Sequence, residues 1–139
     1  MDTTTRATRA AEIKAELAHY CGTTEVYRVA AAGKRMVYTE GVRAMAQLCG
    51  AYWLIGEIQY GLSSRQMAEA TSKDERLRDM VFFDLSVEDR EGVLTARADS
   101  CEPLAYHKEV EFTDFPLDQI DLWAQFDGER WTLMLPSEY

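Results

Sequence analysis

The spacing of hydrophobic residues changes near residue 80. Before that point they recur every three or four residues, which predicts helices, and after it they mostly alternate with polar residues, which predicts strands. Helices followed by strands are typical of an α+β domain with an antiparallel sheet. We therefore expect a single domain over residues 1–139, in which four to six antiparallel strands pack against a central, largely apolar helix, with one further helix at the N-terminus.

The N-terminal part of the chain predicts a helix and a hairpin. The helix is expected over residues 6–20, and residues 1–5 are expected to be disordered. A hairpin is expected over 25–39, because apolar and polar residues alternate on both sides of Gly33, which would turn the chain.

The stretch YTEGVRAMAQLCGAYWLIGEIQYG, residues 38–61, predicts one continuous buried helix. Thr39 is placed to cap its N-terminus. Gly50 and Gly56 are unfavourable inside a helix, so we expect them to allow close approach of another element. Residues 63–79 then form a variable, partly helical excursion.

Beyond residue 80 the alternation predicts strands that are separated by turns. One segment differs, because Pro116 opens it and a short helical turn or helix is expected there, over residues 116–126. The strands are expected within 81–87, 93–99, 105–115 and 130–136. In the third, alternation places Tyr106, Val110 and Phe112 on one face and His107, Glu109 and Glu111 on the other.

The negative charge of the chain is concentrated in its second half. The formal net charge is −9, and residues 81–129 hold 13 acidic and only three basic residues, whereas residues 1–80 are nearly neutral. Such a surface repels nucleic-acid phosphates and attracts basic partners. Acidic surfaces also serve solubility alone, and that alternative stays open.

Sequence motifs for catalysis are absent from the chain. It has no phosphate-binding glycine loop and no nucleophile elbow. Two histidines and two cysteines suggest zinc, but their H-x-C and C-x5-H spacings match no common structural site. A Cys–His nucleophile is disfavoured because nearby carboxylates raise a thiol pKa. We expect no catalytic residues, no metal and no cofactor. The residues weighed for these roles are His19, Cys21, Cys101 and His107.

The remaining cysteine, Cys49, lies in the apolar stretch. No export signal and no membrane span are recognisable, so the three thiols are expected to be reduced in a cytoplasm. Glu57 lies at the edge of the same apolar stretch. We expect it at the rim of the core, because charged residues are rarely fully buried. If it were paired, Arg28 on the hairpin would be a nearer partner than Arg43.

Several short motifs carry a family resemblance. They are the helix entry YTEGV, then GAYWL, TDFPL and the terminal LPSEY. The chain resembles an uncharacterised family of small bacterial proteins, over about residues 11–62 and 109–139. The resemblance implies a setting on phages, plasmids and other mobile elements, and it implies no activity, cofactor or catalytic residue. On physical grounds GAYWL is helix packing, TDFPL is a turn capped by Asp114, and LPSEY is an exposed tail.

These observations favour a binding protein over an enzyme. The hypothesis is an acidic inhibitor of a host defence or nucleic-acid-handling complex, of the anti-CRISPR or anti-restriction kind, which occupies a basic nucleic-acid-binding groove of a protein partner and binds neither nucleic acid nor membrane directly. The residues expected to carry this binding are Asp84, Glu88, Asp89, Glu109, Glu111, Asp114, Asp118 and Asp121.

Two alternatives remain open at this stage. One is a small-molecule binder or enzyme whose pocket lies between the central helix and the sheet; its lining would be Tyr52, Trp53, Glu57, Tyr106 and His107. The other is a structural homodimer with an aromatic interface; its residues would be Phe82, Trp123 and Trp131.

Overall fold

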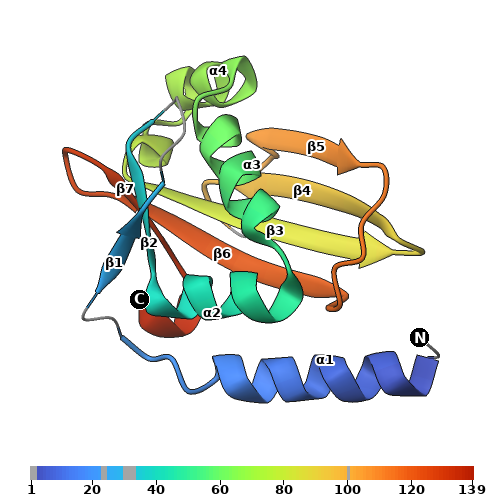
Figure 1. Cartoon of the computed structure of the whole chain (residues 1–139). Helices are drawn as coiled ribbons and strands as arrows, with labels where there is room; N and C mark the ends of the chain where they lie inside the picture. Colours follow the sequence, from blue (N-terminus) through green and yellow to red (C-terminus); the bar gives the residue numbers. More distant parts are fainter. Residues whose placement is uncertain (1–2, 23–24, 30–33, 100) are drawn as a thin grey trace.

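The structure, a computed structural model, describes residues 3–22, 25–29, 34–99 and 101–139 (Figure 1). Its helical segments are α1 (Thr3–Leu17), α2 (Glu40–Cys49), α3 (Tyr52–Leu62), α4 (Arg65–Lys73) and two 3-10 helices, η1 (Glu75–Arg78) and η2 (Pro136–Glu138). Its strands are β1 (Val26–Arg28), β2 (Met36–Thr39), β3 (Met80–Glu88), β4 (Glu91–Arg97), β5 (Tyr106–Val110), β6 (Gln119–Phe126) and β7 (Trp131–Met134).

The seven strands form one mixed sheet in the order β1-β2-β7-β6-β3-β4-β5. The α+β class is confirmed, but the expectation of four to six antiparallel strands is wrong. The alternating pattern predicts six of the seven strands. The seventh, β6, lies in the segment 116–126 for which the sequence predicts a helical turn or helix. In addition, β2 and β7 pair in parallel, with Met36 opposite Trp131. Periodicity shows that a segment is a strand and carries no information about its partner.

Residues 116–126 are therefore not helical from residue 119 onward. Ile120, Leu122 and Ala124 are buried, while the residues between them face the other side of the sheet. Alternation of this kind is the mark of a strand, and it outweighs the weak helix signal of Pro116. The predicted cap at Asp114 is also wrong, because the Thr113 hydroxyl accepts the hydrogen bond from the Phe115 N–H, at 3.1 Å.

The predicted central helix is two helices, α2 and α3. Gly50 ends α2 in the left-handed conformation, with φ of 61°, and glycine adopts this conformation with little strain. The roles expected for the two glycines are thus corrected: Gly50 is a C-cap, and Gly56 has no neighbouring atom within 4 Å of where a Cβ would lie. The cap at Thr39 is confirmed, since its hydroxyl accepts from the Val42 N–H.

The N-terminal helix begins earlier than predicted. It starts at Thr3 and ends at Leu17, so the expected disorder of residues 3–5 is wrong, and residues 1–2 lie outside the described part of the chain. The predicted hairpin is confirmed as antiparallel β1 and β2, although its expected turn at Gly33 also lies outside that part. Ser64 caps α4, in agreement with a helical start near this residue.

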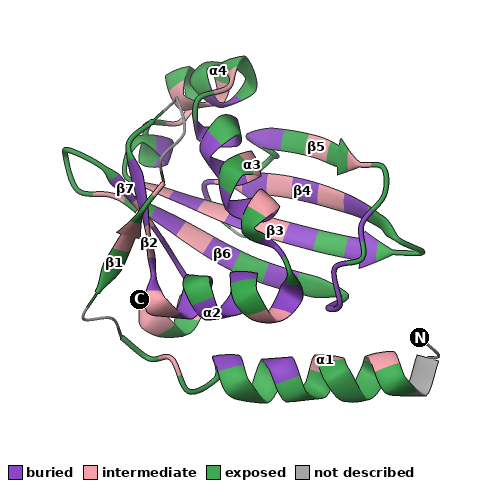
Figure 2. Cartoon of the chain, viewed as in Figure 1, coloured by how far each residue is buried: buried purple, intermediate pink, exposed green. Residues whose placement is uncertain are grey.

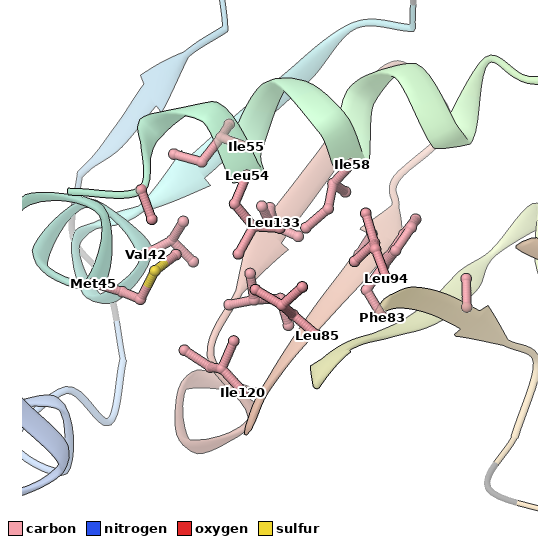
Figure 3. Packing of buried hydrophobic residues seen from close by; sticks show 14 of the residues in the cluster. Val42, Met45, Leu54, Ile55, Ile58, Phe83, Leu85, Leu94, Ile120 and Leu133 are labelled. Carbon is pink, nitrogen blue, oxygen red and sulfur yellow. The ribbon is translucent and has the colours of Figure 1, made fainter. Parts of the chain in front are cut away.

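One face of the sheet packs against α2 and α3 and forms the core. Alternate residues of β3, from Val81 to Val87, are buried on this side (Figure 2). Leu54 and Ile58 of α3 project toward Phe83 and Leu94 of the sheet (Figure 3). Helix α1 lies alongside α2 and adds Ile13 to the same cluster.

The opposite side of the central strands is only partly covered. We call it the open face, defined by Phe82, Asp84 and Ser86 of β3 and the residues beside them on β6 and β4. Among the described helices, none is long and apolar enough to cross a membrane.

The C-terminal residues are held against the fold and are not an exposed tail. The Ser137 hydroxyl donates to the Tyr20 carbonyl at 2.7 Å, and the Tyr139 ring packs edge-on against Trp123. The carboxylate of Glu138 lies at the N-terminus of α2. Terminal residues fray unless they are tied down, and these three contacts tie them down.

Candidate functional site

The predicted acidic residues gather at one end of the sheet. The β3–β4 hairpin places Glu88 directly opposite Glu91. Between them, Asp89 and Arg90 form the turn, and both have positive φ, of 51° and 64°. Carboxylates directly opposite each other on neighbouring strands repel, so this hairpin holds a concentrated negative charge in a fixed geometry.

The connection from β5 to β6 returns to the same hairpin. The Thr113 N–H donates to the Arg90 carbonyl, and the Val87 N–H donates to the Asp118 carbonyl, both at 2.8 Å. Glu109 on β5 lies opposite Val93 on β4. We call this region the acidic end; its carboxylates are Glu88, Asp89, Glu91, Glu109, Glu111, Asp114 and Asp118.

Six of the eight predicted partner-binding residues thus belong to the acidic end. Glu91 also belongs to it, although the prediction omitted it; its place in the turn sequence EDREG was the available signal. Two cations approach the group. Arg6 of α1 lies 3.7 Å from the exposed Asp118 carboxylate, and the Arg90 guanidinium lies over the Phe112 ring at 6.0 Å.

Phe112 is an exposed apolar residue within the acidic end. It has 70% of its surface exposed, although the alternating pattern places it on the same face as Tyr106, which is buried. It lies beyond the end of β5 at Val110, so the strand period no longer sets its direction. An exposed aromatic ring surrounded by charged residues is typical of an interface anchor.

The other two predicted residues, Asp84 and Asp121, lie opposite each other on the open face. The Gln119 amide donates to both carboxylates, and the Ser86 hydroxyl donates to Asp84 at 2.9 Å. Asp121 has an exposed side, yet partial desolvation raises its pKa, and the hydrogen bond and charge of the neighbouring Asp84 carboxylate raise it further. This pair extends the negative surface from the acidic end along the middle of the sheet.

Only part of the predicted aromatic interface is formed. Phe82 and Trp123 are in edge-on contact on the open face, with ring centroids 5.1 Å apart, and Tyr139 packs on the other side of Trp123. Trp131 is buried elsewhere, 5.3 Å from Phe126. The strand register explains this result, because Trp131 pairs with Phe126 and so points to the core side.

The structure does not bring the five predicted pocket residues together. Tyr106 is buried beneath α3, with its ring close to Gly61. His107 is the next residue along β5 and therefore points to the opposite face. Tyr52 is exposed on α3, and Trp53 packs edge-on against Phe115.

Glu57 lies at the rim of the core, with 31% of its side chain exposed. Its ion-pair partner is Lys108 of β5, at 2.5 Å, and not Arg28. The same ammonium group lies over the Tyr60 ring at 5.3 Å. The hydrogen bond to Glu57 raises the pKa of Lys108. Glu57 is thus a structural ion-pair partner between helix and sheet.

The residues weighed for metal or thiol chemistry are also separated. Cys21 and Cys101 are exposed, whereas Cys49 is buried in α2. Burial raises the pKa of the Cys49 thiol to about 11, so this sulfur is protonated at neutral pH. Within the described ranges, no three His, Cys, Asp or Glu residues are grouped closely enough to hold a metal ion.

The fold defines an α+β protein with a mixed seven-stranded sheet, one face of which is covered by helices. The chain belongs to a family described as "Family of unknown function (DUF6876)", whose model matches residues 11–139. No curated protein and no solved structure matches the chain.

Proposed function

We propose that this protein is a non-enzymatic inhibitor that binds a host defence or nucleic-acid-handling complex through its acidic end. The carboxylates would occupy a basic groove of a protein partner and so exclude the DNA or RNA that this groove normally holds. An inhibitor of this kind would be an anti-CRISPR or anti-restriction protein, and we propose that it is carried by mobile elements.

The observation that carries the proposal is the convergence of carboxylates from three separate segments. The β3–β4 turn, strand β5 and the connection from Glu111 to Asp118 all contribute. Backbone hydrogen bonds between these segments fix the spacing of the charges. A fixed array loses little conformational entropy on binding, and its field accelerates association with a basic surface.

Phe112 supports a protein partner in particular. Binding energy in protein interfaces is concentrated in a few aromatic and arginine residues that are surrounded by polar ones. Phe112 and Arg90, stacked together amid the carboxylates, provide this arrangement.

The test is capture of partners by the tagged protein from lysates of strains with different defence systems, at low and high salt. One stoichiometric, salt-sensitive partner that has lost its nucleic acid is the expected result. The Glu109→Lys, Glu111→Lys, Asp114→Lys triple variant should weaken this binding at least about tenfold, since each rim charge contributes mainly to association.

A matched control reverses three exposed carboxylates on helices away from the acidic end. Glu12 and Glu16 lie on α1 and Glu69 lies on α4, and all three are exposed. Their triple lysine variant has the same net charge as the first and should retain binding. Equal affinity of both variants for the captured partner would contradict the proposal.

A second candidate, a homodimer, is favoured by the aromatic contact on the open face. Phe82 and Trp123 are only partly buried there. Light scattering on a sizing column would show a dimer for the native protein and a monomer for Phe82→Lys. A monomeric native protein at high concentration would remove this candidate.

A further inference from the structure

A cleft lined by cations lies at the end of the sheet opposite the acidic end. Its volume is about 360 Å³, within the range of small-ligand pockets. Arg130 immediately precedes β7, and the start of β7 pairs with the last residues of β6. The last residues of β6 lie beside the start of β3, whereas the acidic end lies beyond the other end of β3. The described residues that line the cleft include Arg28, Lys34, Arg35, Arg130 and a single carboxylate, Glu129.

The strand register forces two of these cations together. Met36 and Trp131 are paired in the parallel β2–β7 ladder, and Arg35 and Arg130 are the residues immediately before them. Like charges at neighbouring positions on adjacent strands are destabilising. Arg130 has a long ion pair with Asp127, 3.9 Å between nitrogen and oxygen, in an exposed position.

The other three cations form no ion pair with any residue that the structure describes. These are Arg28 on β1 and the adjacent Lys34 and Arg35. The chain has 24 acidic residues and only 15 basic ones, so the absence of ion pairs at these three cations does not reflect a shortage of carboxylates. Four cations around one cavity with one carboxylate are therefore a distinct feature of this molecule.

The backbone that carries these cations is fixed by the core. Gln59 of α3 is buried, with 2% exposure, and its amide donates to the Lys34 carbonyl at 2.9 Å. The Lys34 N–H donates to the Ser63 hydroxyl at 3.0 Å, and the Trp131 N–H donates to the Arg35 carbonyl at 2.9 Å. The backbone at these residues is therefore ordered before a ligand binds, which lowers the entropic cost of binding.

We propose that this cleft binds a small molecule through a diphosphate or triphosphate group. Guanidinium groups present several N–H donors in a plane that matches phosphate oxygens, and three of them surround the cavity. With Lys34 included and Glu129 subtracted, the lining has an excess of three positive charges, which suits a pyrophosphate better than a single carboxylate or sulfate. The site is separate from the acidic end, and its test does not depend on the proposed inhibition.

The experiment is isothermal titration of the full-length protein with inorganic pyrophosphate at low and near-physiological salt. One pyrophosphate should bind per chain, and orthophosphate, with fewer charges, should bind at least about tenfold more weakly. Arg35→Gln and Arg130→Gln should each weaken pyrophosphate binding about tenfold or more, because each removes charge-assisted hydrogen bonds.

Matched controls are Arg65→Gln and Arg78→Gln, exposed arginines of α4 and η1 that remove the same charge outside the cleft. Both should bind pyrophosphate within about twofold of the native protein. Pyrophosphate should also raise the melting temperature of the native protein and of both controls, but not that of the Arg35→Gln, Arg130→Gln double variant.

Three results would overturn the assignment. The first is no heat and no thermal shift with pyrophosphate at low salt. The second is an equal loss of binding in the cleft variants and in the controls, which would indicate only a diffuse charge effect. The third is tighter binding of single-stranded DNA that strengthens with oligonucleotide length and is lost in the cleft variants, since the cleft would then serve a nucleic acid and not a small molecule.

Discussion

The carboxylate of Glu138, next to the last residue of the chain, accepts a hydrogen bond from the hydroxyl of Thr39, with 2.6 Å between the oxygens. Its second oxygen accepts from the Gly41 N–H at 3.2 Å. Thr39 is the N-cap of α2, so the side-chain carboxylate of Glu138 completes the cap and meets the positive end of the helix dipole. This side chain therefore joins the last turn of the chain to the start of α2.

Glu138→Gln is expected to destabilise the protein by about 1.5–3 kcal/mol, the range for hydrogen bonds to charged groups. The amide that replaces one carboxylate oxygen is a donor and cannot accept from Thr39 and Gly41 together. Urea unfolding measures this loss. Glu16→Gln, on the exposed side of α1, removes the same charge and should change stability by no more than about 0.5 kcal/mol. Equal stability of the two variants would contradict the capping role.

Two glycine-to-alanine substitutions are expected to have opposite effects. A Cβ on Gly41 would lie 2.5 Å from the Glu138 carboxylate oxygen, so Gly41→Ala displaces the cap. A Cβ on Gly56 meets nothing within 4 Å, and this residue is inside α3. Gly56→Ala should therefore stabilise the protein by about 1 kcal/mol, while Gly41→Ala destabilises it.

Thermal unfolding of the two glycine variants, measured side by side, checks this prediction. A rise in the melting temperature of Gly41→Ala would show that Glu138 moves aside without loss. A fall for Gly56→Ala would show that α3 is not helical at this position.

Asp121→Asn is expected to stabilise the protein at neutral pH and to lose this advantage in acid. The pKa of Asp121 is raised in the folded state, first by burial and then by Asp84, so folding disfavours its ionised form. This destabilisation is present above the folded pKa. It disappears as the pH falls and the carboxyl becomes protonated in both states.

Chemical denaturation at neutral pH and at acidic pH measures this difference. Asp114→Asn, which removes an exposed carboxylate of the acidic end, serves as the control and should show a smaller pH-dependent gain. Identical pH profiles for the native protein and Asp121→Asn would mean that the Asp84–Asp121 contact does not affect folding.

Thiol labelling should distinguish the three cysteines. Cys21 and Cys101 are exposed and should react with a disulfide reagent in the native protein. Cys49 is 5% exposed and has a thiol pKa of about 11, so it should react only after unfolding. Rapid labelling of all three thiols under native conditions would contradict the burial of α2.

Local patterns account for most of the elements but not for their arrangement. The strands β3, β4 and β5, the cap at Thr39 and the hairpin of β1 and β2 all follow from spacing and capping chemistry. The parallel pairing of β2 with β7 does not, because it joins residues 95 positions apart, such as Met36 and Trp131, through backbone groups that every residue possesses.

The sequence also predicts poorly where helices and strands end. Gly50 was read as part of a helix, whereas its positive φ ends that helix. Alternation places Phe112 on the same face as Tyr106, whereas β5 ends at Val110 and Phe112 is exposed. Element ends depend on tertiary contacts more than element centres do, and spacing alone locates them poorly.

The sequence predicts most residues of the acidic end, but it does not predict the cationic cleft. Charge density along residues 81–129 is visible in the sequence, and neighbouring strands with short turns bring such residues together. Arg28, Lys34, Arg35 and Arg130 are scattered through a neutral region and the last ten residues. The β1–β2 pairing brings Arg28 close to Lys34 and Arg35, and the β2–β7 ladder then places Arg130 beside them.

That ladder also sets the order in which the chain can fold during synthesis. The β1–β2 hairpin emerges early, but it joins the sheet through β7, whose residues are among the last to be made. A two-stranded hairpin alone is at best marginally stable in water. A nascent chain that stops before Trp131 lacks β7 and therefore keeps β1 and β2 unjoined from the other four strands. Incomplete copies of this protein therefore expose unpaired strand edges, which favour aggregation with other chains.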